Sequence, residues 1–155
     1  MNHEADQKAK ELHEQLLQQA NQQRDEHDKI QFRRLQLVTP QLFAEFLAEK
    51  GVAGHCLACG HKELSTPETM SLDSSRSPFP DKKPSELTEE ESAQYVAATA
   101  VHYVTPSLID TSKVPSVSNH QYRMICPSCG FISYFRAANV VYWVEDRINE
   151  QGDQP

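Results

Sequence analysis

Four cysteines in two matching pairs constrain this chain more than any other feature. Cys56 and Cys59 lie in the segment CLACG, and Cys126 and Cys129 lie in the segment CPSCG. Two residues separate the cysteines of each pair, so a tight turn can direct both sulfurs toward one ion. The glycine that follows each pair can adopt a positive φ and let the chain turn back. Each segment, here called a knuckle, therefore predicts half of a metal site.

The rest of the sequence indicates the cellular compartment, and therefore the redox environment, of these thiols. Residues 1–30 are dominated by charged and amide side chains and contain no apolar stretch typical of a secretory signal. No later stretch has the length and hydrophobicity of a membrane span. We therefore expect a cytoplasmic protein without a membrane segment. In that reducing setting, paired thiols bind metal more often than they form disulfides.

The two knuckles together predict one structural zinc ion. Four thiolates complete a tetrahedral shell with no open position for water, which is typical of a structural rather than a catalytic zinc. A redox dithiol and an iron–sulfur cluster are the alternatives. Neither pair lies in a clear strand-to-helix redox context, and paired knuckles with glycines favour zinc. The predicted ligands are Cys56, Cys59, Cys126 and Cys129.

The second knuckle carries a resemblance to a known class. Its order Cys126-Pro127-Ser128-Cys129-Gly130 is similar to the Cys-Pro-x-Cys-Gly of four-cysteine zinc-ribbon proteins of the small bacterial or phage type. The resemblance implies an α+β fold in which antiparallel hairpins carry the knuckles. It implies no single function, because zinc ribbons serve in transcription, RNA processing and ribosomes. Residues 60–125 separate the knuckles, so the ribbon must be expanded by a long insertion.

The chain divides into one modest domain with polar appendages. Its hydrophobic content is 38%, which suits a single core rather than two. We expect a polar N-terminal helix or arm over residues 1–38 and a disordered tail over 151–155. The zinc-ribbon domain occupies 39–150 and includes a flexible loop at about 73–92, where proline, serine and charge accumulate.

The N-terminal segment from Glu4 to about Arg34 predicts a helix, because it is rich in good helix formers and lacks proline and glycine. Two interpretations of its surface remain open. A heptad-like stripe favours a short coiled coil that makes a homodimer, whereas the glutamine-rich stretch after it favours a solvated helix. The stripe consists of Ala5, Ala9, Leu12 and Leu16.

A second helix is predicted from Pro40 to about Gly51. Thr39 can cap it, Pro40 suits its first position, and Gly51 can end it in a left-handed conformation. Val38 and Phe43 have the spacing of a hydrophobic staple. The helix should pack on the domain through an apolar stripe formed by Leu42, Phe43, Phe46 and Leu47.

The remaining elements are read from local patterns. Residues 95–105 are ambiguous, because a Thr88–Glu91 capping box predicts a helix while the β-branched and aromatic content favours a strand, which we prefer. Residues 122–125 and 131–135 should form a hairpin around the second knuckle. We expect Asn139 to cap a final helix, with Trp143 at the edge of its apolar face. That face consists of Val140, Val141, Val144 and Ile148.

No pattern in the sequence indicates an enzyme. Paired carboxylates, a nucleophile elbow and a phosphate-binding glycine loop are all missing from the sequence. His55 and His61 flank the first knuckle and could replace a cysteine ligand, but four cysteines make surface positions the better interpretation. His102 and His120 are too isolated to indicate a catalytic role.

The function predicted from the sequence is that of a protein-interaction or adaptor module with an unidentified protein partner. The alternative is a zinc-ribbon nucleic-acid-binding protein or transcription regulator. The net charge of −7 argues against a broadly basic nucleic-acid binder. Strand alternation allows only part of the mixed aromatic and basic set near the second knuckle to be exposed. That set consists of Tyr122, Arg123, Phe131, Tyr134, Phe135 and Arg136.

Overall fold

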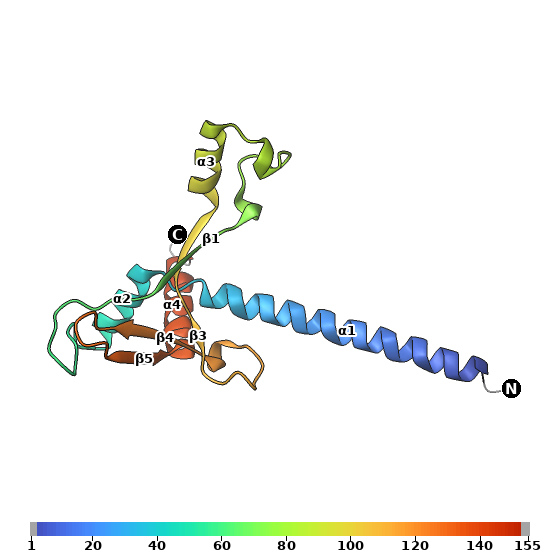
Figure 1. The fold of residues 1–155 in the computed structure, drawn as a ribbon, viewed down its shortest axis with the longest axis horizontal. Coiled ribbons are helices and arrows are strands. Elements are labelled where there is room, and N and C mark those ends of the chain that lie inside the picture. The colour runs from blue at the N-terminus through green and yellow to red at the C-terminus, as the bar shows by residue number, and fades with distance from the viewer. Residues whose placement is uncertain (1–2, 153–155) are drawn as a thin grey trace.

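The computed structural model describes residues 3–152, which form a body with two long projections (Figure 1). One projection is the first helix, and the other is an arm formed by residues 68–104. The elements in chain order are α1 (His3–Leu35), α2 (Pro40–Glu49), β1 (Glu68–Leu72), η1 (Ser74–Arg76), η2 (Pro84–Glu86), α3 (Glu89–Thr99), β2 (Ala100–Val104), β3 (Ser107–Leu108), η3 (Val117–Asn119), β4 (His120–Ile125), β5 (Ile132–Arg136) and α4 (Ala137–Gly152).

Helix α1 confirms the predicted N-terminal helix and lies mostly outside the body. Every residue from His3 to His27 is exposed. Only its last turns are anchored, where Phe32 stacks edge-on against Tyr103 and the side chain of Gln31 accepts a 2.9 Å hydrogen bond from the amide of Val117. The buried residue Leu35 ends the helix inside the core.

Helix α2 forms as the sequence predicts. The Thr39 hydroxyl accepts a hydrogen bond from the amide of Leu42, Pro40 opens the helix, and Gly51 follows it with a φ of 69°. The staple residues Val38 and Phe43 are both buried, so the entry to the helix is fixed by apolar packing. Of the predicted stripe, Phe43, Phe46 and Leu47 are buried and Leu42 is partly buried.

Two small antiparallel sheets accompany the helices. In the body the strands are ordered β3-β4-β5, with Tyr122 opposite Phe135 and Ile125 opposite Ile132. In the arm β1 pairs with β2, so that Glu68 lies opposite Val104. The mixed helix–sheet fold and the hairpin around the second knuckle confirm the sequence-based expectation.

The strand expected over residues 95–105 is wrong for its first half. Residues 95–99 belong to α3, and only 100–104 form a strand. The Thr88–Glu91 capping box is complete: the Thr88 hydroxyl accepts from the Glu91 amide, and the Glu91 carboxylate accepts from the Thr88 amide. These two bonds and the alanines that follow outweigh the β propensity of Tyr95 and Val96.

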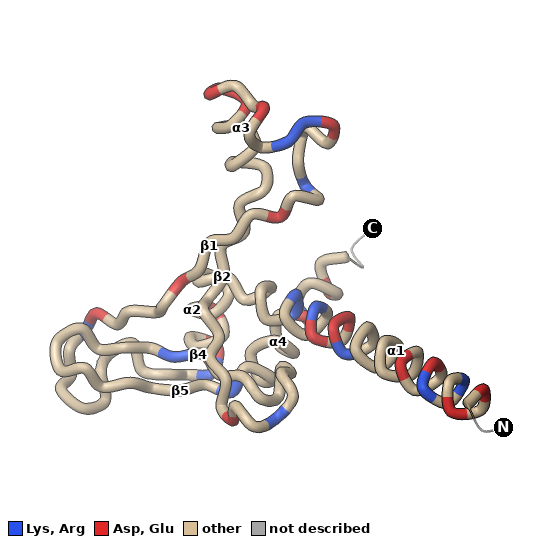
Figure 2. The backbone as a smooth tube through the Cα atoms, turned by 45° about the vertical axis from the view of Figure 1, so that its right-hand side comes forward, with Lys and Arg blue, Asp and Glu red and all other residues tan. Residues whose placement is uncertain are grey.

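The segment expected to be a loop at about 73–92 contains short regular structure. Two 3₁₀ turns, η1 and η2, occupy it, and its last residues form the start of α3. Side-chain caps stabilise these turns, such as the 3.1 Å hydrogen bond from the amide of Ser75 to the Asp73 carboxylate. Acidic residues gather at the start of α3 in the arm, while acidic and basic residues alternate along α1 (Figure 2).

Helix α4 begins earlier than expected. It starts at Ala137, directly after β5, so Asn139 lies inside the first turn and does not cap it. Val140, Val141 and Val144 are fully buried as predicted, but Ile148, near the C-terminal end of the helix, is 45% exposed. Of the tail expected at 151–155, residues 151–152 belong to α4 and 153–155 lie outside the described residues.

A single core joins these elements. Tyr122 of β4 packs against Phe43, which in turn packs edge-on against Phe135, while the valines of α4 cover the same hairpin face. Leu35 and Val38 belong to this core as well, so the end of α1 is built into the body. No helix within residues 3–152 combines the length and apolar character needed to cross a bilayer.

Candidate metal centre

The two knuckles have the same backbone geometry. In the first, the amide of Cys56 donates to the carbonyl of His61 at 2.8 Å, and the amide of Gly60 donates to the carbonyl of Cys56 at 2.8 Å. In the second, the amide of Cys126 donates to Phe131 at 2.9 Å, and Gly130 donates back to Cys126 at 2.9 Å. Residues distant in sequence thus form matching turns.

The glycine after each cysteine pair has the conformation that the sequence predicts. Gly60 has a φ of 75° and Gly130 a φ of 76°. Residues with a Cβ rarely adopt this left-handed region, so glycine allows the chain to reverse directly after the second sulfur of each knuckle.

A short bridge between main-chain segments brings the knuckles together. Ser65 and Ile125 exchange two hydrogen bonds, from the Ser65 amide to the Ile125 carbonyl at 2.8 Å and in the reverse direction at 2.7 Å. Ile125 directly precedes Cys126, so this bridge fixes the chain after the first knuckle beside the start of the second.

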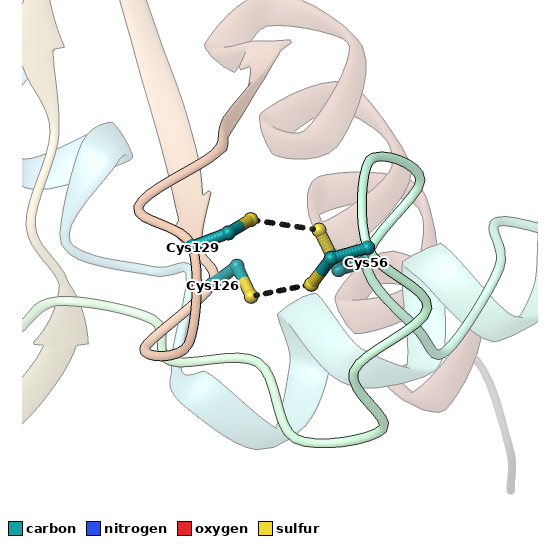
Figure 3. A group of neighbouring side chains, drawn as sticks. Cys56, Cys126 and Cys129 are labelled. Atoms are coloured by element: carbon teal, nitrogen blue, oxygen red, sulfur yellow. Dashed lines mark hydrogen bonds between the residues drawn. The ribbon is translucent and has the colours of Figure 1, made fainter.

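The four predicted cysteines converge on one point. Their sulfur atoms all lie within 4.8 Å of one another. Two sulfur contacts join different knuckles: Cys56 lies 3.7 Å from Cys129, and Cys59 lies 3.7 Å from Cys126. Figure 3 shows Cys126 and Cys129 of the second knuckle facing Cys56 of the first. All four are free cysteines. The cluster is therefore close enough to bind a metal ion.

Each knuckle contributes one buried and one exposed cysteine. Cys56 is 2% exposed and Cys126 is 1% exposed, whereas Cys59 and Cys129 face solvent. Each 3.7 Å contact thus joins a buried thiol of one knuckle to an exposed thiol of the other. A bound ion would sit at the edge of the body, with one side reachable from solvent.

Without a bound ion, the thiols of Cys56 and Cys129 differ widely in pKa. Burial opposes the thiolate of Cys56, but hydrogen bonds from the amides of Cys59 and Ala58, with help from the neighbouring thiols, lower its pKa to about 7. At Cys129 the amide of Phe131 favours the thiolate, yet the thiol of Cys59, partial desolvation and the other thiols raise the pKa to about 12. A cation is needed to hold four thiolates together.

The sulfur spacing fits a single tetrahedral ion. Metal–sulfur bonds of about 2.3 Å place the sulfurs of a regular tetrahedron about 3.8 Å apart. The two sulfur–sulfur distances of 3.7 Å between the knuckles match this edge. No other sulfur pair is more than 4.8 Å apart, so a regular tetrahedron requires only a small contraction. Among residues 3–152, no other group of three or more histidine, cysteine or acidic side chains converges in this way.

The histidines near the first knuckle do not join the cluster. His55 is exposed and His61 is half-buried, and neither belongs to the convergent set. His102 on β2 is exposed in the arm, and the imidazole of His120 lies 2.6 Å from the carbonyl of Ser116.

The aromatic and basic residues near the second knuckle divide between two faces of the hairpin. Tyr122 is fully buried and Phe135 is half-buried, so both face the core. Tyr134 and Arg136 point outward and are exposed, and half-buried Arg123 lies opposite Tyr134 on the same face. Only part of the set is therefore available to a ligand, as alternation predicts.

Ser65 is the residue of this centre that the sequence does not indicate. It has no role in a recognisable motif, and its contribution comes from its main chain rather than its side chain. The only local signal is the position of Ser65 a few residues after the first knuckle, where a ribbon strand could begin.

Comparison with protein-family models, with curated proteins and with solved structures finds no match for this chain.

Proposed function

We propose that this chain is a non-catalytic zinc-ribbon-type protein, in which one zinc ion holds an interaction module in shape. The convergence of four sulfurs from two distant knuckles, with pairs at 3.7 Å, carries this proposal. The proposed ligands are Cys56, Cys59, Cys126 and Cys129. No fifth position remains for water or substrate, so the ion stabilises the fold rather than taking part in catalysis.

The sulfur geometry favours a single ion over a cluster. An iron–sulfur cluster places several iron and sulfide atoms between its cysteines, which requires sulfurs farther apart than 4.8 Å. A single iron ion would occupy the same tetrahedron as zinc, so metal analysis must separate the two. Zinc is favoured because it needs no redox role and is the common ion of structural four-cysteine sites.

The proposed ion cross-links two segments that are distant in the sequence. It joins residues 56–59, which follow α2, to residues 126–129, which connect β4 and β5. The long arm is inserted between these two points. The Ser65–Ile125 bridge alone supplies two main-chain hydrogen bonds, each worth about 1 kcal/mol. Structural zinc contributes on the order of 10 kcal/mol, so the ion dominates this junction.

A protein partner fits the surface better than nucleic acid. The chain carries a net charge of −7, and α1 presents three leucines, Leu12, Leu16 and Leu17, that are 58%, 56% and 49% exposed. Apolar side chains of this size on a projecting helix favour contact with another protein.

One observation supports the nucleic-acid alternative. On the outer face of the hairpin, exposed Tyr134 lies opposite Arg123 and two residues from exposed Arg136. An aromatic ring between two guanidinium groups could stack a base of a single strand and contact its phosphates. Two cations are few for such binding, so this remains the second candidate.

Metal analysis of protein purified without added metal tests the proposed zinc site. We expect one zinc ion per chain and loss of hairpin structure when a chelator removes it. Cys56→Ser should lower zinc content and disorder both the region around the first knuckle and the β4–β5 hairpin, as seen by amide exchange. Ser107→Ala is a matched control, because Ser107 lies on β3 away from the cluster.

Two results would contradict the zinc proposal. One is a folded hairpin with four reactive thiols and no bound metal; the other is stoichiometric iron in place of zinc. The partner class is tested by titrating the zinc-bound protein with single- and double-stranded DNA and RNA at low and moderate salt. Absence of binding at low salt removes the nucleic-acid alternative.

A further inference from the structure

Helix α1 offers a surface that the body leaves uncovered. All residues from His3 to His27 are exposed, and Asp28 is the first residue that is half-buried. Six positions that alternate in spacing between four and three residues lie along one face of this free segment. We call them the α1 stripe: Ala5, Ala9, Leu12, Leu16, Gln19 and Gln23.

The side chains of the α1 stripe change in size and polarity along the helix. Its N-terminal positions hold small alanines, its centre holds two leucines, and its C-terminal positions hold glutamines. Leu12 and Leu16 are 58% and 56% exposed, so the apolar centre has no partner within the described chain. A helix face of this kind gains free energy by packing on a second helix.

We propose that α1 pairs with the α1 of a second copy of this chain, in antiparallel orientation, about a centre between Leu12 and Leu16. In this register Leu12 lies opposite the partner's Leu16, and Ala9 lies opposite the partner's Gln19. Ala5 lies opposite the partner's Gln23, and each layer occurs twice by symmetry.

The antiparallel register matches side-chain volumes in every layer. Each alanine faces a long glutamine, whose methylene groups cover the alanine while its amide reaches solvent at the edge. The two central layers each contain two leucines. Small residues opposite large ones fill an interface evenly without strain.

A parallel pair would match the same residues poorly. It places alanine against alanine at one end, which leaves voids, and glutamine against glutamine at the other, which buries amides without apolar contact. The antiparallel register also brings Asp6 onto the same flank as the partner's Arg24, so opposite charges meet near both ends.

The antiparallel pair is compatible with the rest of the molecule. His3 lies level with the partner's Asp25, which is still within the exposed part of α1. The overlap therefore ends before the partner's body begins. The two bodies project from opposite ends of the paired helices, and both metal centres remain clear of the interface. This inference does not depend on the identity of the bound metal.

Analytical ultracentrifugation of the full chain tests whether the pair forms. We expect a concentration-dependent dimer, and we expect Leu12→Asp with Leu16→Asp to raise its dissociation constant at least about 100-fold. Gln7→Asp with Asn21→Asp is the matched control: it adds the same charge on the opposite face of α1 and should leave the dimer intact. Helix content measured by circular dichroism should be retained in both variants.

A distance measurement tests the orientation. A nitroxide attached at Asp25 through a ketone-bearing amino acid leaves the four cysteines unlabelled. Antiparallel pairing separates the two labels by about 33 Å along the axis, at about 1.5 Å per residue, whereas parallel pairing places them side by side. A strictly monomeric protein, a dimer unaffected by the leucine substitutions, or a short label distance would each overturn the proposal.

Discussion

The hydroxyl of Tyr122 donates a 2.9 Å hydrogen bond to the main-chain carbonyl oxygen of Leu35. Tyr122 lies at the centre of β4 and is fully buried, and Leu35 is the last residue of α1. The bond thus connects the end of the projecting helix to the hairpin that carries the second knuckle. A polar tip inside an apolar core requires such a partner, because an unpaired hydroxyl would be costly there.

Tyr122→Phe should lower the free energy of unfolding by about 1 kcal/mol, because it removes this hydrogen bond while the ring still fills the core. The carbonyl of Leu35 keeps a longer bond of 3.4 Å from the amide of Val38, which limits the loss. Urea unfolding of the protein in its metal-loaded form measures the change. Tyr134→Phe is the control, since its ring is exposed, and an equal effect in both variants would contradict the assigned role.

The stability of the protein should fall at alkaline pH in a manner that depends on Tyr122. Burial raises the pKa of this phenol above its ordinary value, so the folded chain retains a proton that the unfolded chain releases. The contribution is complete below about pH 10 and is lost as the pH rises further. Unfolding free energies measured across this range should decline less steeply for Tyr122→Phe than for the wild-type protein.

An ion pair connects the last turn of α1 to α4. Arg34 donates to both oxygens of Glu145 at 2.6 and 2.9 Å, and its guanidinium also lies 5.4 Å from the centre of the Tyr142 ring. The carboxylate of Glu145 raises the pKa of Arg34. The pair is only about one-quarter exposed, so water screens it less than a surface pair.

Arg34→Lys should therefore destabilise the protein by about 1 kcal/mol, because lysine keeps the charge but cannot make two parallel hydrogen bonds or stack on the ring. Thermal unfolding together with amide exchange at residues 28–35 measures the effect. Lys113→Gln is the control, since the Lys113–Asp110 pair is largely exposed. An unchanged melting temperature for Arg34→Lys would show that the pair does not anchor α1.

The two knuckle glycines should affect metal affinity through backbone strain. Space for a Cβ exists at Gly60 and Gly130, but both have a positive φ. Alanine there costs about 1–2 kcal/mol, so each substitution should weaken binding of the proposed zinc ion about tenfold, measured by competition with a chelator. Asparagine should cost less, because it tolerates this conformation better.

Gly54→Ala separates strain from packing in the same experiment. Gly54 lies two residues before Cys56, also has space for a Cβ, and does not have a positive φ. Its substitution should leave zinc affinity unchanged. If Gly54→Ala weakened binding as much as Gly60→Ala, the conformation of the knuckle glycines would not be the cause.

Local patterns predicted those parts of the fold whose causes lie within a few residues. The cap and staple of α2 involve Val38, Thr39 and Phe43, and each knuckle is specified by two cysteines and the next glycine. The exposed outer face of β5 follows from strand alternation alone. The capping box of α3 is visible in the sequence too, but its two hydrogen bonds outweigh the strand propensity of Tyr95.

Boundaries and distant contacts could not be predicted in the same way. The chain passes from β5 directly into α4 at Ala137, so Asn139 lies inside the first turn instead of capping the helix. Ile148 shares the helical face of Val144, yet it is exposed near the C-terminal end of α4. Burial depends on the length of the opposing surface, which periodicity does not contain.

The sequence by itself determined the candidate donor set of four cysteines, since two knuckles with glycines specify both the available ligand chemistry and the local turns. Only the tertiary structure decided that the knuckles meet, through the Ser65–Ile125 bridge and sulfur contacts of 3.7 Å between Cys56 and Cys129 and between Cys59 and Cys126. The physical reason is that spacing along a chain fixes short turns, whereas the approach of segments separated by an inserted arm depends on the packing of the whole core.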